Sequence, residues 1–352
     1  MRYILHLLRS FFPGLLFFLY GPLVFSQNTR QIRKYYEWVN KAELAITDRH
    51  YEQALHAYDK AARIKTLFSY DAHNALMSAV ELGKYAKAVR YVEQLESKKG
   101  IPRAFFAQRK FEPLRRSKEW AAYAATKQPA PAIDTLLRKR IDDLLVLDQK
   151  YRGDNLKYAD SINLADSIIR LEINEILQRY GYPSEDITGV WMHSDSTFYL
   201  RSPFDIMLLH AVKNGADDLA PTLLQSIRKG DMHPLKFVML SQFFTTPNAY
   251  AYGCSGSNQV VYVQVEKEIF TCCCDREKEI NANRNAIFLE PVADLKKKIE
   301  FNYRLDKRFK LNVSNATSYL SYSKNVEEAR KNVMAQKDFI LFKTLPSNTS
   351  YY

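Results

Sequence analysis

The chain is predicted to be mostly helical, and two features of its sequence support this. Gly is scarce, with 11 residues among 352, whereas Tyr and Phe together number 43. Apolar residues also recur at helical spacing over most of the chain. Hydrophobic residues make up 47% of the chain and charged residues 26%, so a sizeable core is expected and global disorder is excluded. The length allows two domains.

The N-terminus has the pattern of a secretory signal peptide. Arg2 and Arg9 precede an apolar stretch over residues 11–25, and Val24 and Ser26 are small enough to flank a cleavage site before Gln27. We therefore expect export to a bacterial periplasm or cell surface. An uncleaved N-terminal anchor is the alternative, although the stretch is short for a membrane span.

Residues 27–127 contain a repeat with a spacing of thirty-four residues. The matched positions are Trp38, Ala42, Tyr51, Ala54, Tyr58 and Ala61 in the first unit, and Ala72, Leu76, Tyr85, Ala88, Val92 and Leu95 in the second. This pattern resembles the tetratricopeptide repeat, a helix-turn-helix unit whose stacks bind polypeptides. A degenerate third hairpin over residues 103–126 is expected to cap the array.

The resemblance implies a groove that is lined by the first helix of each unit. Its expected partner-binding residues are Tyr36, Val39, Glu43, Thr47, Tyr70, His73, Met77 and Glu81. A partner protein or peptide of the cell envelope would bind there by hydrophobic and aromatic contacts. The alternative is that the chain's own later residues fill the groove.

Residues 128–131 form a Pro-containing linker, and residues 132–345 are expected to form a helical domain of unknown function. One helix is predicted over residues 159–180, with Leu164, Ile168, Leu171 and Ile176 facing inward. Alternating β-branched and aromatic residues predict a small β-hairpin near 259–273, and residues 339–345 are expected to form a last strand or a docked tail. Residues 346–352 are expected to form a frayed tail.

Several short motifs of the second domain resemble an uncharacterised bacterial domain family. They comprise Asp148-Gln149 with Arg152, Tyr180-Gly181-Tyr182-Pro183, Leu209-His210-Ala211, Tyr252-Gly253, and Arg284 with Pro291. Because the function of that family is not established, the resemblance implies a fold unit and a candidate site. A His with a carboxylate partner serves as a general base in many enzymes, so His210, Asp148, Arg152 and Tyr252 are the candidate catalytic residues. The alternative is a buried network that fixes the helices.

Four cysteines, Cys254, Cys272, Cys273 and Cys274, fall in or near the predicted hairpin. In an exported protein a disulfide between Cys254 and one of the other three is the first expectation. Free thiols and a metal site are the alternatives. Metal is disfavoured because no Cys-x-x-Cys spacing occurs, and no cofactor is expected.

The chain is basic, with a formal net charge of +12. One cluster of cations, formed by Lys296, Lys297, Lys298, Arg304, Lys307 and Arg308, is a candidate surface for an anionic polymer or a membrane. Nucleic acid is not an expected partner of an exported protein. The favoured interpretation is thus a peptide-binding protein, with an enzyme and a polymer binder as alternatives.

Overall fold

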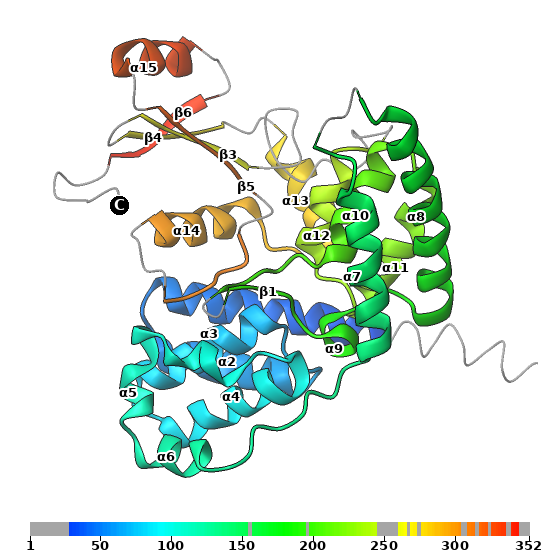
Figure 1. Cartoon of the computed structure of the whole chain (residues 1–352). Coiled ribbons are helices and arrows are strands. Elements are labelled where there is room, and N and C mark those ends of the chain that lie inside the picture. The colour runs from blue at the N-terminus through cyan, green and yellow to red at the C-terminus, as the bar shows by residue number, and fades with distance from the viewer. Residues whose placement is uncertain are drawn as a thin grey trace, which may run out of the picture.

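A computed structural model of the chain describes residues 28–153, 157–194, 197–244, 260–265, 268–272, 276–303, 308–313, 317–322, 325–335 and 339–344. Helices predominate in this part of the chain, and the strands form one sheet of two strands and one of four (Figure 1). The predicted mostly helical fold is therefore confirmed. None of the helices in the described ranges is long and apolar enough to cross a membrane.

The first hundred residues form two successive helical hairpins. Residues 28–47 and α2 (Tyr51–Ala62) make the first hairpin, and α3 (Ser69–Glu81) and α4 (Tyr85–Lys99) make the second. The small residues of the repeat are buried, which lets the helices approach closely. They are Ala42, Ala54, Ala61, Ala72 and Ala88, all with no exposed surface.

The third hairpin is made of short pieces rather than of two full helices. It comprises η1 (Arg103–Ala107), η2 (Arg109–Phe111), α5 (Glu112–Arg115) and α6 (Lys118–Ala124). Its aromatic residues nevertheless complete the core of the array. Phe105, Phe106 and Phe111 are fully buried, and their rings contact one another with centroids 5.3 to 5.7 Å apart.

A second group of helices follows the linker. Its elements are α7 (Thr135–Gln149), α8 (Ala159–Tyr180), α9 (Glu185–Thr188), β1 (Met192–Ser194), β2 (Thr197–Phe198), α10 (Pro203–Lys213), η3 (Asp217–Leu219), α11 (Ala220–Lys229) and α12 (Pro234–Ser241). The helix α10 starts at a capping box, in which Ser202 and Asp205 each bond to the other's backbone N–H. This start fixes the position of the helix that carries His210.

The predicted inward face of α8 is wrong. Leu164, Ile168 and Leu171 are 65%, 42% and 71% exposed, whereas Ala165, Ile169 and Ile173 are buried. Both sets have helical spacing and lie one or two residues apart in the sequence, so periodicity alone does not choose between them. Only Ile176 of the predicted set is buried.

The predicted hairpin exists and belongs to a larger mixed sheet. The sheet has the order β5-β3-β4-β6, and its strands are β3 (Val260–Val265), β4 (Glu268–Cys272), β5 (Thr317–Tyr322) and β6 (Phe339–Thr344). Strand β4 pairs antiparallel with β3 and with β6, whereas β5 runs parallel to β3. For residues 339–345 the sequence predicted either a strand or a docked tail, and β6 is the strand. Strand β5 was not predicted.

Three helices accompany this sheet. They are α13 (Glu277–Ala286), α14 (Val292–Tyr303) and α15 (Val326–Ala335). Figure 1 shows α14 between the four-stranded sheet and the N-terminal hairpins. Buried residues of the hairpins, of α7 to α12 and of α13 to α14 form one continuous hydrophobic cluster. The three regions therefore share a core.

Candidate functional site

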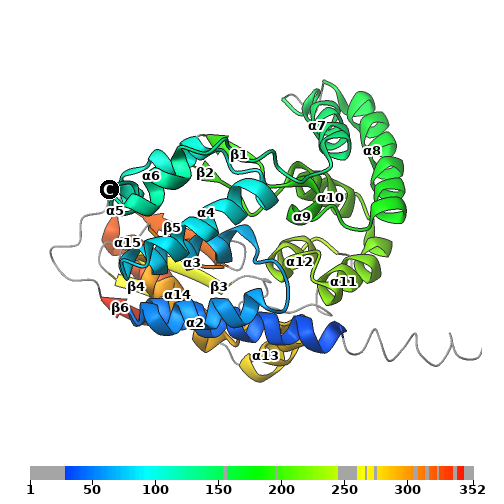
Figure 2. The same ribbon diagram turned by 90° about the horizontal axis from the view of Figure 1, so that it is seen from below.

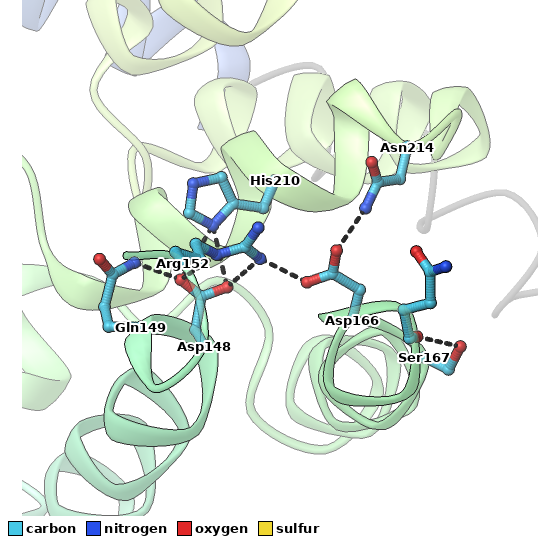
Figure 3. A network of polar contacts seen from close by, with 8 residues as sticks. Asp148, Gln149, Arg152, Asp166, Ser167, His210 and Asn214 are labelled. Atoms are coloured by element: carbon cyan, nitrogen blue, oxygen red, sulfur yellow. Dashed lines mark hydrogen bonds and ion pairs between the residues drawn. The ribbon is translucent and has the colours of Figure 1, made fainter. Parts of the chain in front are cut away.

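Three of the four candidate catalytic residues, His210, Asp148 and Arg152, meet where α7, α8 and α10 pack together (Figure 3). Asp148 lies in the last turn of α7, and His210 lies in the last turn of α10. Nδ1 of His210 is 2.9 Å from each carboxylate oxygen of Asp148. The two residues are 62 positions apart in the sequence, so the fold itself brings them together.

Arg152 lies on the other side of the same carboxylate. Its guanidinium donates to Oδ1 of Asp148 at 2.8 Å and also to Asp166 of α8. Asn214, just after α10, donates to the second oxygen of Asp166 at 2.7 Å. The three helices are thus joined by a chain of charged hydrogen bonds, in which Arg152 is already neutralised by two acids.

Burial differs sharply between the two members of the Asp148–His210 pair. The Asp148 side chain is fully buried, whereas that of His210 is 20% exposed. Burial by itself would raise the pKa of Asp148, but hydrogen bonds from His210 and Arg152 outweigh it and lower the pKa below its usual value. Asp148 is therefore an anion that only accepts hydrogen bonds.

This geometry determines which ring nitrogen of His210 carries the proton when the imidazole is neutral. Because an ionised carboxylate faces Nδ1, the neutral ring carries its proton on Nδ1 and leaves a lone pair on Nε2. In Figure 3, Nε2 of His210 points away from Asp148. Within the described part of the chain, no residue forms a hydrogen bond to Nε2. The pair has the arrangement of an oriented general base.

Three of the four candidate catalytic residues belong to this network of six charged or amide groups, which also includes Gln149 of the same sequence motif. Tyr252, the fourth predicted residue, lies outside the described residues. Asp166 and Asn214 were missed, since each is a single polar residue beside apolar helix positions with no motif around it. Only the contact between α8 and the loop after α7 reveals their role.

Two other motif residues of the second region, Tyr182 and Arg284, lie in buried structural clusters. Tyr182 donates to Asp205, and Lys236 contacts both of them at 3.0 and 2.9 Å. Arg284 donates to the backbone carbonyl of Glu290 at 2.6 Å. These side chains are 5% exposed or less, so we assign them to the packing of the fold rather than to chemistry.

The expected partner groove is filled by the chain's own later residues. Tyr36, Val39, Glu43, Tyr70, His73 and Met77 are buried, and Thr47 is half-buried. Residues 308–313 lie along the groove: Asn74 exchanges two hydrogen bonds with the backbone of Lys310, at 2.7 and 3.0 Å. Glu81 pairs with Arg308 at 2.7 Å. The groove is therefore not open to a partner in this structure.

A buried ion cluster fixes this occupied state. Lys298 of α14 lies 2.6 Å from Glu43 and 3.3 Å from Glu290, and the other oxygen of Glu43 accepts hydrogen bonds from Asn312 at 2.8 and 2.9 Å. Burial raises the pKa of Glu43, and Lys298 only partly offsets this effect. No local pattern points to the cluster, because Glu43 lies more than 240 positions before Glu290, Lys298 and Asn312.

The predicted basic cluster is not one surface. Lys298 is buried in the ion cluster and Arg308 is paired with Glu81, so neither is free for a polyanion. Lys297 is exposed, while Lys296 is half-buried. Arg304 and Lys307 lie outside the described residues. Periodicity explains the error, because successive residues of a helix are rotated by about 100° around its axis, so Lys296, Lys297 and Lys298 do not share one face.

No metal site is formed by His, Cys, Asp or Glu within the described ranges. Of the four cysteines, only Cys272 falls in these ranges, at the end of β4. The predicted disulfide among Cys254, Cys272, Cys273 and Cys274 therefore stays a prediction. Comparison of the chain with protein-family models, with curated protein sequences and with solved structures gave no match.

Proposed function

We propose that this chain is an exported enzyme in which His210 is a general base oriented by Asp148. The observation that carries the proposal is the pairing of Nδ1 with a buried carboxylate while Nε2 has no described partner. The peptide-binding interpretation is less favoured, because most of its groove residues are already buried within the chain.

The chemistry that fits this pair is removal of a proton from water or from a substrate hydroxyl. Nε2 accepts the proton, and Asp148 stabilises the imidazolium that forms. Arg152 holds Asp148 in place and, being shared with Asp166, is a positioning residue rather than an anion receptor. A general base of this kind contributes roughly 10² to 10⁴-fold to a rate.

The test compares the full-length protein with His210→Gln, which preserves a donor toward Asp148. His56→Gln, at an exposed position of α2, is the matched control. Each protein is incubated with small-molecule envelope extract, and substrate loss is followed by untargeted mass spectrometry. We expect a compound consumed by the wild type and the control, with at least about 100-fold slower loss in His210→Gln. Equal consumption by His210→Gln, or none by the wild type, contradicts the proposal.

A second candidate function, peptide binding, is favoured by the way residues 308–313 are held. The Asn74 side chain of α3 binds the backbone of this segment at Lys310, and Phe309 stacks on Tyr51 with ring centroids 5.6 Å apart. A partner peptide of similar sequence would have to displace the segment. Phe309→Ala in the full chain should then raise the affinity for an added peptide of residues 308–313. Absence of binding to both proteins rules out this function.

A further inference from the structure

A cavity at the start of the described chain is lined by four cations. Its volume is about 600 Å³, and it lies between residues 28–33 and the side of α11 that runs from Pro221 to Lys229. The cations are Arg30, Arg33, Arg228 and Lys229, and the other lining residues are Asn28, Thr29, Pro221 and Gln225. Figures 1 and 2 both show α11 beside the blue end of the chain.

The positive charge of this cavity is not cancelled by neighbouring acids. No carboxylate lines it, and within the described ranges none of the four cations forms a salt bridge. Asp231, which follows α11, is not among the lining residues; burial raises its pKa, and the charges of Lys65 and Lys229 oppose this effect. Four cations that converge on one hollow repel one another and favour a bound anion.

The walls of the cavity are held in place by contacts that do not neutralise its cations. Arg33 donates to the backbone carbonyl and to Oδ1 of Asn285, at 3.0 and 2.6 Å, and lies 4.8 Å from the centre of the Phe288 ring. These partners are neutral, so they orient the guanidinium but leave it positive. At the opposite wall, Gly230 at the end of α11 packs directly against Ile32, and this contact fixes the two walls relative to each other.

We propose that this cavity binds a phosphate group. Guanidinium groups match the geometry of phosphate oxygens and bind them through paired hydrogen bonds. The phosphate could belong to an anionic lipid headgroup or to a free polyphosphate. The lipid source is favoured for the uncut chain, the alternative to cleavage before Gln27, because the apolar stretch over residues 11–25 ends three positions before Asn28 and would hold the cavity close to a membrane surface. The site is independent of His210.

The test uses full-length protein with Arg30→Gln and Arg228→Gln combined, since both side chains are exposed and the fold should persist. The control, Lys118→Gln with Lys278→Gln, removes the same charge from exposed positions elsewhere. Binding is measured to vesicles with and without phosphatidylglycerol, and separately to inorganic pyrophosphate.

We expect the cavity variant to lose about 30-fold in affinity, roughly fivefold for each cation, while the control changes little. A loss confined to phosphatidylglycerol vesicles identifies the lipid headgroup, and a loss confined to pyrophosphate identifies a free phosphate. An equal loss in the control would show that only overall charge matters and would overturn the proposal. Failure of the wild type to bind either probe would also overturn it.

Discussion

The substitution Lys298→Met tests whether α14 is joined to the N-terminal hairpins by a buried ion cluster. Lys298 is 2% exposed at its side chain and Glu43 is 1% exposed, with 2.6 Å between Nζ and Oε2. Met has a similar volume, so the change removes charge without opening a large cavity. Two carboxylates, Glu43 and Glu290, would lose their shared cation, although Arg284 remains 3.6 Å from Glu290.

We expect Lys298→Met to lower the free energy of unfolding by about 3–5 kcal/mol, because removing one partner leaves a buried charge uncompensated. The estimate is at the lower end if Glu43 takes up a proton, and burial already raises its pKa in the native protein. A second substitution, Glu43→Gln, removes the stranded charge and should restore part of the lost stability.

Urea denaturation of the full-length protein, followed by circular dichroism, measures this loss as a change in the free energy of unfolding. Lys297→Met is the matched control, since that residue is exposed one position earlier on the same helix, and it should change stability by less than about 0.5 kcal/mol. A loss below about 1 kcal/mol for Lys298→Met, or one equal to the control, would refute the assigned role of the cluster.

Three further substitutions test other parts of the fold. Burial and the charge of Glu43 raise the pKa of Asp71 from 3.8 to about 7, so the folded state holds this proton more tightly and stability falls as pH rises from about 4 to 7. The difference in free energy of unfolding between Asp71→Asn and the wild type should therefore rise by about 2 kcal/mol in favour of the variant from pH 5 to pH 8 in urea titrations. A difference that stays constant with pH would contradict this. Gly230→Ala should lower the free energy of unfolding by about 2 kcal/mol, because φ is +82° and the new Cβ would lie 2.7 Å from Cδ1 of Ile32. An unchanged melting temperature would argue against this geometry. Phe198→Ala should lower the free energy of unfolding by about 3–5 kcal/mol in the same denaturation assay, since the buried ring packs against Tyr70 and Phe105. A loss under about 1 kcal/mol would mean that the ring is not well packed.

Much of the local structure could be predicted from the sequence, because local patterns determine it. The small residues Ala54, Ala61 and Ala88 predicted close helix packing, and all three are buried. Alternating residues predicted the hairpin of β3 and β4. By contrast, β5 pairs with β3 from more than 50 positions away, and no local pattern specifies such a partner.

The candidate site was predictable only in part for the same reason. Paired motifs identified Asp148, Arg152 and His210, which do meet, whereas Asp166 joins them through a contact between helices that no motif marks. A groove filled by the chain's own later residues was one alternative from the sequence, but no local pattern could decide between a filled and an open groove. Its contacts join α3 to residues 236 positions later, and a repeat pattern describes the shape of a groove but not what lies in it.

The tautomer of His210 is the most direct test of the proposed general base, because it needs no knowledge of the substrate. Histidine-selective ¹⁵N labelling of the full-length protein reports which ring nitrogen carries the proton, and His210→Gln assigns the signal. The contact with Asp148 predicts that the neutral form of the ring is protonated at Nδ1, with Nε2 as the proton acceptor. Asp148→Asn should reduce this preference. A neutral ring protonated at Nε2 in the wild type would contradict the proposed role of His210.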